Sequence, residues 1–473
     1  MDFDLVAIGG GLAGLTAAVR AAQLGGRVAV LERGATADYL CNSRVSGGVI
    51  HVAQHDVKRP EAELRKIATD ATEGWSDPEA LEVMVTDTRR GIDFLRGCGI
   101  NFVRGYNQNW VMAPPRPAVN PLVWKGLGTD RAISGLQRTL SSLGGQLLLG
   151  HRAVRLLTEG ERCVGVVAET ESGAVEIRAG AIVIADGGFH ANLELLRQHV
   201  GPNPERLRAR NVGQATGDGL SMAAAIGAAT TPLDRFYGHL LSIDAFTNDE
   251  LWPYPQIDLV ALAGIVVDRS GRRLFDEGLG GIYAANTLAQ MDDPASGIVI
   301  CDAPIWETAG KEALIPPNPR LERAGGTLHR ADTLAALASL AGIDAAALAA
   351  TVSAYNTGVT GGAGESLTPP RSGHKKRPTA IATAPFFAIP ICAGITNTMG
   401  GLSADADGRV RREGGGYVDG LYAAGAAAGG LEGGPHVVYV GGLCRAVVFG
   451  MRSAEHALAQ AAPAQSAAAG GRR

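Results

Sequence analysis

The first fourteen residues contain glycines at a spacing that is typical of dinucleotide-binding turns. Gly9, Gly11 and Gly14 form a G-x-G-x-x-G turn that follows an apolar stretch at 3–8 and precedes a helical pattern. The first glycine permits a tight turn, the second lets a pyrophosphate approach the backbone, and the third lets the helix pack closely on the strand. Glu32 follows a second apolar stretch, where its carboxylate can accept a hydrogen bond from a ribose hydroxyl. Strand, turn, helix and acid together predict a dinucleotide-binding unit.

Further polar and glycine-rich segments recur along the chain and supply other contacts of such a site. They are the loop at 42–48, the segment after an apolar strand at 181–185, the Ala-Thr-Gly-Asp-Gly run at 215–219, and the glycines at 420–425. A final helix is predicted from about 442 to 460. The residues predicted to bind the cofactor are Gly9, Gly11, Leu12, Ala13, Gly14, Glu32, Arg33, Ser43, Arg44, Gly47, Gly48, Val154, Asp186, Gly187, Thr216, Asp218, Gly425, Gly441, Gly442 and Leu443.

The wide separation of these segments favours FAD over NAD. An NAD-binding domain is usually contiguous, whereas here the N-terminal turn is completed by residues near the C-terminus. FAD is long, and its extended form needs one set of contacts for ADP and another for the ribityl chain and isoalloxazine ring. The helix beginning near Gly442 is expected to point its positive end at the flavin N1/O2 edge and to stabilise the negative charge of reduced flavin.

Composition excludes several other classes of protein. The chain has 43 basic and 47 acidic residues, a net charge of −4, which gives no sign of nucleic-acid binding or of attraction to an anionic membrane. Its six cysteines are scattered and form no C-x-x-C pair, which disfavours a zinc ribbon, a dithiol redox centre and c-type haem. No metal site is predicted. A reducing, cytoplasmic location fits best, and because no apolar run reaches ~18 residues, membrane insertion is not expected.

The predicted strands and helices that position these residues indicate an α/β fold. A Rossmann-like FAD-binding domain, split in sequence, surrounds an inserted α+β capping domain that contains Trp252, Trp306 and most of the long loops. The predicted FAD-binding parts are 1–231 and 381–460, the capping or substrate domain is 232–380, and 461–473 is a disordered tail.

The chain resembles the flavoprotein superfamily of fumarate reductases, succinate dehydrogenases and 3-ketosteroid dehydrogenases. The resemblance rests on the N-terminal glycines, the 215–219 run, Thr-Met-Gly-Gly-Leu at 398–402 and the glycines at 420–425, and it covers most of the chain. It implies a split FAD domain, a cap inserted after the 215–219 run, and a substrate trapped between cap and flavin. The implied chemistry is hydride transfer between flavin N5 and a carbon next to an electron-withdrawing group.

Departures from the fumarate reductase pattern restrict the classes of substrate that we expect this chain to accept. The arginine proton donor of those enzymes falls on Gly281, a histidine falls on Asn397, and a second arginine falls on Tyr439, while one substrate-binding histidine is retained as His239. These losses remove the charged clamps for two carboxylates, which disfavours fumarate and succinate. Tyr439 places the chain nearer the branch resembling 3-ketosteroid or tricarballylate dehydrogenases, the former using a tyrosine and a backbone N–H to polarise a ketone oxygen.

The resulting hypothesis is a ketone desaturase or ene-reductase that forms or reduces a C=C bond α,β to a carbonyl. Tyr439 and the amides of Gly441 and Gly442 would stabilise enolate-like charge, and a second group would move the α-proton. Several tyrosines of the cap region are candidates for that group. The candidate catalytic residues are Tyr439, Tyr237, His239, Asn397 and Tyr254, with Tyr283 as a further tyrosine.

Covalent attachment of the flavin is not expected. No histidine lies in the 42–48 loop, and Cys41 is interpreted as a plain buried cysteine. Arg44 either touches the flavin or braces its loop. An acid that often follows the 420–425 glycines in the family, where it contacts the ribityl chain, is Ala426 here, so this contact must come from elsewhere.

Other functions stay open at this point. One alternative is a di- or tricarboxylate dehydrogenase of the same superfamily. An alternative of another class is a flavoprotein electron-transfer subunit, whose relay centres would lie on another chain because this one has no haem or iron–sulfur motif. A flavin monooxygenase or oxidase is a third. The expected partners are a small-molecule substrate and an unidentified electron acceptor or donor.

Overall fold

The chain divides into two compact units. The computed structural model describes residues 2–105, 109–117 and 123–470, with side chains described to residue 460. Unit 1 comprises Met1–Asn192, Asn211–Arg235 and Asn397–Arg473, and unit 2 comprises Leu193–Arg210 and Phe236–Thr396. These divisions lie 4 and 16 residues beyond the sequence-based boundaries at 231 and 380, and they add the short segment 193–210 to the second unit.

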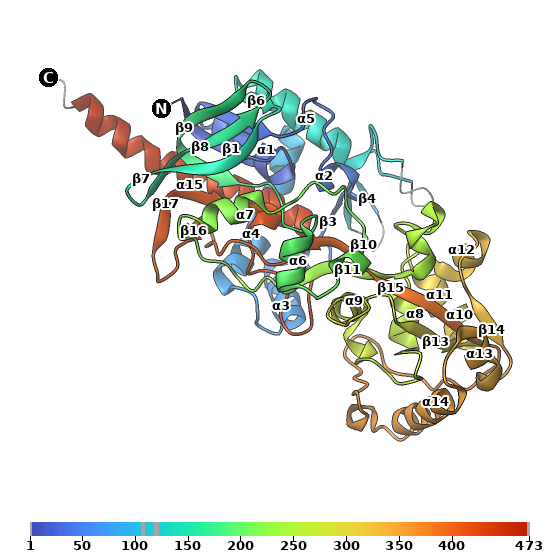
Figure 1. The fold of residues 1–473 in the computed structure, drawn as a ribbon. Coiled ribbons are helices and arrows are strands. Elements are labelled where there is room, and N and C mark those ends of the chain that lie inside the picture. Colours follow the sequence, from blue (N-terminus) through green and yellow to red (C-terminus); the bar gives the residue numbers. More distant parts are fainter. Residues whose placement is uncertain (1, 106–108, 118–122, 471–473) are drawn as a thin grey trace. The chain divides into compact units, whose positions relative to one another are not determined.

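Unit 1 is built on a largely parallel sheet (Figure 1). Its strands follow the order β16-β17-β9-β1-β2-β6, in which β6, β2, β1, β9 and β17 are parallel and β16 is antiparallel to β17. An antiparallel ribbon of β7 and β8 pairs with β9. The bounds are β1 Phe3–Ile8, β2 Val28–Glu32, β6 Gln146–Leu149, β7 Arg152–Glu159, β8 Arg162–Thr170, β9 Gly173–Ile184, β16 Arg409–Arg411 and β17 Tyr417–Ala423.

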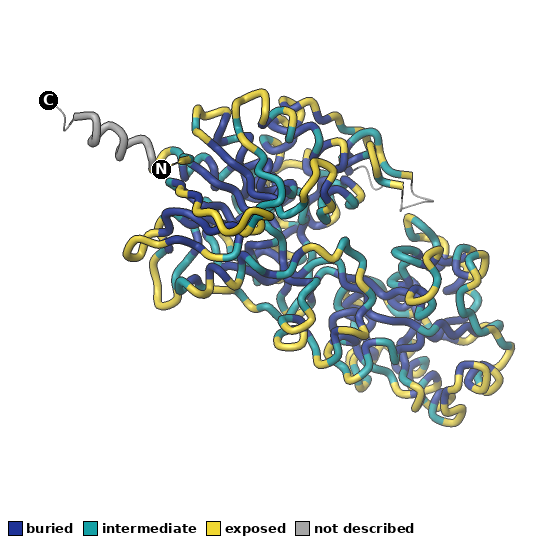
Figure 2. The backbone as a smooth tube through the Cα atoms, turned by 45° about the horizontal axis from the view of Figure 1, so that its top comes forward, coloured by how far each residue is buried: buried dark blue, intermediate teal, exposed yellow. Residues whose placement is uncertain are grey.

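The apolar run of β1 is buried on both faces, as expected of a central parallel strand. Leu5 and Ala7 belong to a core shared with the helices α1, α4, α5 and α15, while Val6 and Ile8 belong to a second core that includes residues of β8 and α7. Figure 2 shows the buried residues of the chain in dark blue. Other elements of unit 1 are α1 Leu12–Gln23, α2 Asn42–Val45, β3 Val49–Ile50, α3 Glu61–Thr72, α4 Pro78–Gly97, β4 Phe102–Arg104, β5 Trp110–Met112, α5 Gly128–Ser142, α7 Asp218–Ala224 and α15 Gly442–Gly470.

Unit 2 surrounds the long strand β15, Phe386–Thr398. Strands β10, β11, β13 and β14 all pair with β15, and β12 pairs with β13. The remaining bounds are α6 Leu193–His199, β10 Arg208–Ala209, β11 Phe236–Ser242, α8 Asp258–Ala263, β12 Ile265–Val267, α9 Gly281–Ala289, β13 Ile298–Asp302, α10 Ala303–Glu307, α11 Ala309–Glu312, α12 Pro317–Arg323, β14 His329–Ala331, α13 Leu334–Ala341 and α14 Ala345–Thr360. This mixed sheet with helices agrees with the α+β interpretation of the inserted segment.

The last helix is longer than the sequence indicated. We expected it to end near residue 460 and to give way to a disordered tail, but α15 continues to Gly470, and residues 471–473 lie outside the described part of the chain. The run of alanines after residue 460 explains the difference, because alanine has the highest helix propensity. In the described residues no helix is both long enough and apolar enough to span a membrane.

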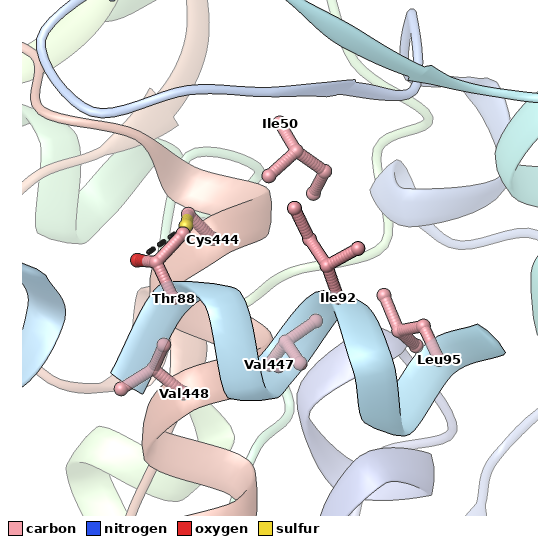
Figure 3. A pocket seen from close by; sticks show the side chains of 8 residues that line it. Ile50, Thr88, Ile92, Leu95, Cys444, Val447 and Val448 are labelled. Carbon is pink, nitrogen blue, oxygen red and sulfur yellow. Dashed lines mark hydrogen bonds between the residues drawn. The ribbon is translucent and has the colours of Figure 1, made fainter. Parts of the chain in front are cut away.

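A small apolar pocket lies between α4 and the beginning of α15 (Figure 3). Thr88 and Cys444 face each other there, with 3.0 Å between Oγ1 and Sγ. The pocket is too narrow to hold a water molecule, so it is a packing seam rather than a ligand site. Its lining residues are Ile50, Thr88, Gly91, Ile92, Leu95, Cys444, Val447 and Val448.

Gly14 gives the first prediction, because a Cβ at this position would overlap the backbone carbonyl of Gly9. We expect Gly14→Ala to lower the unfolding free energy by about 1–3 kcal/mol through overpacking and to weaken FAD binding. Thermal unfolding and flavin titration measure both effects. Gly97→Ala is the matched control because a Cβ at Gly97 meets nothing within 4 Å. Equal behaviour of the two variants would contradict the packing role of Gly14.

Candidate functional site

The dinucleotide turn has the backbone geometry that its glycines predicted. Gly9 has a φ of +102°, a conformation that favours glycine, and a Cβ there would lie 2.7 Å from the Ala185 carbonyl oxygen. At Gly11 a Cβ would meet only Ser43 Oγ at 3.6 Å and the same carbonyl at 4.0 Å. The backbone at Gly11 is therefore open to a close ligand, directly before the first residue of α1.

Glu32 ends β2 beside this turn. Its carboxylate accepts hydrogen bonds from the backbone N–H groups of Gly10, at 2.9 Å, and Gly34, at 2.8 Å. The Tyr39 hydroxyl donates to the Gly10 carbonyl at 2.5 Å, so Glu32 and Tyr39 hold the two peptide groups on either side of the Gly10 Cα. A buried carboxylate oriented in this way is suited to accept a further bond from a ribose hydroxyl.

A second group of predicted residues is joined by side-chain hydrogen bonds. Arg33 donates to Thr216 Oγ1 at 3.3 Å and to Gln214 Oε1 at 2.6 Å, and Thr216 donates to Asp218 Oδ1 at 3.0 Å. The residue after β2 is thus tied to the residues that begin α7. Val154 lies on β7, half-buried, and α7 packs against that strand.

Asp186 follows β9 and lies against Gly9, whose hypothetical Cβ would be 2.7 Å from the Asp186 Cα. One carboxyl oxygen accepts the Gly219 N–H at 2.7 Å, and the other is buried with no hydrogen-bond partner among the described residues. Burial raises the pKa of this carboxyl to about 7, and the negative charge of Asp218 adds to the shift. An unpartnered buried oxygen beside the dinucleotide turn is a place for a hydroxyl group of FAD.

Ser43 and Arg44 are two of the residues that hold the 42–48 loop to the rest of unit 1. Ser43 Oγ accepts the Leu12 N–H at 3.1 Å, which connects the loop to the first turn of α1. Arg44 is buried, forms an ion pair with Asp130 and donates to the Ala37 carbonyl at 2.6 Å. Of the two roles considered for Arg44, the structure therefore supports bracing of the loop. Gly47 and Gly48 follow directly, and Gly48 has a φ of +73°.

The beginning of α15 is ordered by residues that the sequence analysis missed. Glu432 is buried, and its Oε1 accepts the N–H groups of Val440, at 3.0 Å, and Gly441, at 2.8 Å. Its Oε2 lies 3.1 Å from Nη1 of the buried Arg445. The sequence signal was available: Glu432 and Arg445 are charged residues isolated in a glycine-rich and apolar segment, where a charge needs a partner.

Tyr439 turns back onto the same helix start. Its hydroxyl accepts the Gly442 N–H at 2.8 Å. The predicted role of the Gly441 and Gly442 amides in stabilising a carbonyl oxygen needs revision for this arrangement, because both N–H groups already donate to side chains. Leu443 follows, half-buried, in the first turn of α15.

His51 is a further residue that the sequence analysis did not single out. Its ring packs edge-on against Tyr439, with 5.6 Å between centroids, and Nδ1 accepts the Gln54 N–H at 3.1 Å. Burial lowers the pKa of His51 to about 4, so the ring is neutral at physiological pH. The His51 ring therefore adds no charge beside the Tyr439 ring.

The other catalytic candidates have separate surroundings. Asn397 belongs to unit 1, and its Nδ2 donates to the Thr398 carbonyl at 3.2 Å. In unit 2 the Tyr254 ring lies 5.4 Å from the Arg210 guanidinium. The Tyr283 ring packs edge-on against Phe275 at 6.4 Å.

Tyr237 and His239 are neighbours on β11. Their rings meet edge to face, with 5.0 Å between centroids. His239 Nδ1 lies 2.5 Å from Asp258 Oδ2. Asp258 was not a candidate from the sequence, since a single acid between apolar residues gives no sign of a distant histidine partner.

The predicted cofactor residues fit FAD. Gly9, Glu32 and Asp186 each follow or end a parallel strand, and the carboxyl ends of parallel strands share one edge of a sheet. Gly425 follows β17 at that same edge, and a Cβ there would lie 2.9 Å from the Ala13 Cβ. One sheet thus brings together the glycine opening, the acid that is predicted to bind a ribose hydroxyl, and the unpartnered Asp186 oxygen.

Comparison with known proteins agrees with this geometry. The family described as "FAD binding domain" matches residues 4–437. The chain is 25% identical over 471 residues to a probable fumarate reductase, Ifc3, of Shewanella frigidimarina (strain NCIMB 400), covering 96% of this chain and 75% of that protein. It is 30% identical over 305 residues to 4-oxocyclohex-2-ene-1-carboxylate 5-dehydrogenase of Sinomonas cyclohexanicum, covering 59% of this chain and half of that protein.

A solved structure has the same fold. The 3-ketosteroid Δ1-dehydrogenase of Sterolibacterium denitrificans aligns with a TM-score of 0.72 at 20% identity, covering 97% of this chain and 99% of that one. The α/β fold and the superfamily inferred from the sequence are confirmed.

The Asp186 carboxyl gives a prediction on pH. Its folded pKa of about 7 lies above the usual 3.8, so between these values the folded protein retains a proton that the unfolded chain has lost. The unfolding free energy of the flavin-free protein should therefore fall as pH rises from 4 to 7, by at most about 1.4 kcal/mol per pH unit. Asp186→Asn should remove this slope and stabilise the flavin-free protein at pH 8.

Denaturant unfolding at several pH values measures this effect. Asp292→Asn, at an exposed carboxyl, is the control and should leave the slope unchanged. An unchanged slope in Asp186→Asn would show that this carboxyl is ionised throughout.

Proposed function

Because the chain belongs to the FAD-binding domain family, we propose that it forms or reduces a carbon–carbon double bond α,β to a ketone carbonyl. At the level of reaction class, the protein is an FAD-dependent oxidoreductase that acts on CH–CH groups. Bound FAD would supply the acceptor or donor of the hydride that the substrate carbon exchanges. The residues of this chain must bind the substrate, polarise its carbonyl and exchange the α-proton.

The hydrogen bond from the Gly442 amide to the Tyr439 hydroxyl carries the proposal. An oxygen that accepts an N–H at the positive end of a long helix carries less electron density, so its own O–H becomes a stronger donor. Such a donor stabilises the negative charge that develops on a carbonyl oxygen as it becomes enolate-like. The Gly441 amide is less suited to stabilise charge on a carbonyl oxygen, because its N–H already donates to the Glu432 carboxylate.

The surroundings of Gly281 support a ketone over a dicarboxylate. A side chain at this position would overlap the Asp258 carboxyl group, so an arginine donor has no room there unless Asp258 moves. At position 439 a tyrosine replaces the second cation and supplies a neutral hydroxyl. A neutral hydroxyl beside the neutral His51 ring suits a ketone oxygen better than a carboxylate.

The Sinomonas relative supports a cyclic ketone as the substrate. The name of that enzyme specifies oxidation of a ring that carries a ketone conjugated to a double bond. Of the features in that name, we propose only the ring ketone for the substrate of this chain.

FAD is proposed to be bound without a covalent link. Burial raises the pKa of the Cys41 thiol to about 11, which leaves it protonated and unreactive at neutral pH. The flavin should therefore be released into the supernatant when the protein is precipitated with acid.

Anaerobic flavin bleaching tests the proposal. The oxidised holoprotein is mixed with cyclohexanone, with 4-oxocyclohex-2-ene-1-carboxylate or with succinate, and absorbance is followed in the visible band of the flavin. We expect bleaching by a cyclic ketone and none by succinate. Tyr439→Phe should slow the bleaching by ~10²–10³-fold, the usual effect of removing one donor to a developing oxyanion.

Tyr417→Phe is the matched control, since Tyr417 lies in β17 with its ring under Arg409 and has no assigned role. Bleaching by succinate or by a tricarboxylate, with no response to ketones, would favour the carboxylate dehydrogenase. Rapid bleaching by NAD(P)H alone, or turnover that consumes oxygen and yields peroxide, would contradict the ketone proposal.

A further inference from the structure

Unit 2 contains a buried histidine and carboxylate that resemble the paired groups of a general base. His239 lies on β11 and Asp258 is the first residue of α8. The His239 side chain is one-tenth exposed, and its Nδ1 is 2.5 Å from Asp258 Oδ2. In serine hydrolases a carboxylate in this position fixes the orientation and tautomer of the histidine and stabilises its protonated form.

The carboxylate itself is held in one orientation. Asp258 Oδ1 accepts the Leu240 N–H at 2.8 Å, so each carboxyl oxygen has a different partner on β11. The backbone of Gly281 packs so closely on this carboxyl group that any side chain there would overlap it. Asp258 can therefore orient the ring of His239.

The tautomer follows from the partners of the ring. Since a carboxylate only accepts, Nδ1 carries the hydrogen and Nε2 presents a lone pair. Nε2 is buried and has no hydrogen-bond partner among the described residues. A buried polar atom without a hydrogen-bond partner lowers the stability of the folded protein by about 1–3 kcal/mol. An unpartnered Nε2 therefore indicates a group that binds a ligand rather than one that stabilises the fold.

We propose that His239 is the base that takes the α-proton of the carbonyl substrate, and that Asp258 is its positioning residue. This inference rests on the proposed function. In the oxidative direction the α C–H bond breaks and its proton goes to Nε2, while its electron pair forms the new double bond. The β-hydrogen leaves with its electron pair as hydride to FAD, so the substrate loses two electrons and the cofactor gains them.

Charged neighbours set the range of pH in which this base works. Burial lowers the pKa of His239, the nearby Asp258 carboxylate opposes the shift, and the Arg210 cation adds to it. Lys375 also interacts electrostatically with the Asp258 carboxylate, and its ammonium group lies against Gly280. His239 is therefore neutral at physiological pH and is protonated only in acid below its usual value of 6.5.

Arg210 and Lys375 are held differently. Arg210 donates to the Pro253 carbonyl at 3.2 Å and to Thr396 Oγ1 at 3.0 Å, so it is a fixed positive charge. The surrounding protein lowers the pKa of Lys375 while Asp258 opposes the change.

Single-turnover kinetics on the holoprotein test the role of His239. Flavin bleaching by cyclohexanone is measured anaerobically from pH 5 to 9, together with wash-out of deuterium from the α-positions of cyclohexanone into water. We expect His239→Gln to slow both processes by ~10²–10⁴-fold, the usual contribution of a positioned base. The wild-type rates should fall as pH drops through a pKa below 6.5, and this acid limb should vanish in the variant.

Asp258→Asn and His329→Gln provide the comparison. Asp258→Asn keeps an oxygen for Nδ1–H but removes the charge, so we expect a smaller loss of rate and an acid limb moved to lower pH. His329→Gln, at a half-buried histidine of β14, should leave rates and pH profile unchanged. If His239→Gln does not fold, the ¹⁵N spectrum of the wild-type histidines decides: a neutral Nδ1–H tautomer for His239 is required.

The outcomes separate the two proposals. If no ketone bleaches the wild-type flavin or exchanges its α-deuterium, the proposed function fails. If ketones bleach the wild-type protein and His239→Gln equally, the function stands and this inference is overturned. An Nε2–H or fully protonated His239 at pH 7 would overturn it as well.

Discussion

The register of strand β9 is the constraint on which the cofactor site depends. Ile184 pairs with Ile8 of β1 on one side and with Ala423 of β17 on the other, all in parallel. The residues that follow these three must therefore lie at one edge of the sheet, although the chain between β9 and β17 contains all of unit 2. A one-residue slip of β9 would turn its apolar side chains to the opposite faces and move Asp186 away from the glycine turn.

The second constraint is the buried carboxylate of Glu432, which lies just before α15. By accepting two successive amides and facing Arg445, it fixes the backbone at Val440 and Gly441. The Gly442 amide is then the one left for Tyr439. The proposed carbonyl donor thus depends on the ion pair of Glu432 and Arg445, and replacing only one of these residues would leave a buried charge uncompensated.

Local patterns were sufficient to predict that part of the candidate site is placed at strand ends. Gly9, Glu32 and Asp186 follow apolar runs with regular spacing, and such runs indicate buried parallel strands. The rest of the candidate site depends on contacts between distant residues. No spacing connects His239 with Asp258 or Tyr439 with His51, and only the folded chain shows that Gly441 has already given its amide to a side chain.

The central claim is that the flavin takes a hydride from the carbon β to a ketone. The most direct measurement is the anaerobic rate of flavin bleaching with cyclohexanone that carries deuterium only at its β-carbons, compared with unlabelled cyclohexanone. We expect slower bleaching with the labelled ketone, because the β C–H bond breaks as the flavin is reduced. Bleaching at the same rate with both, under conditions where binding and mixing are fast, would contradict it.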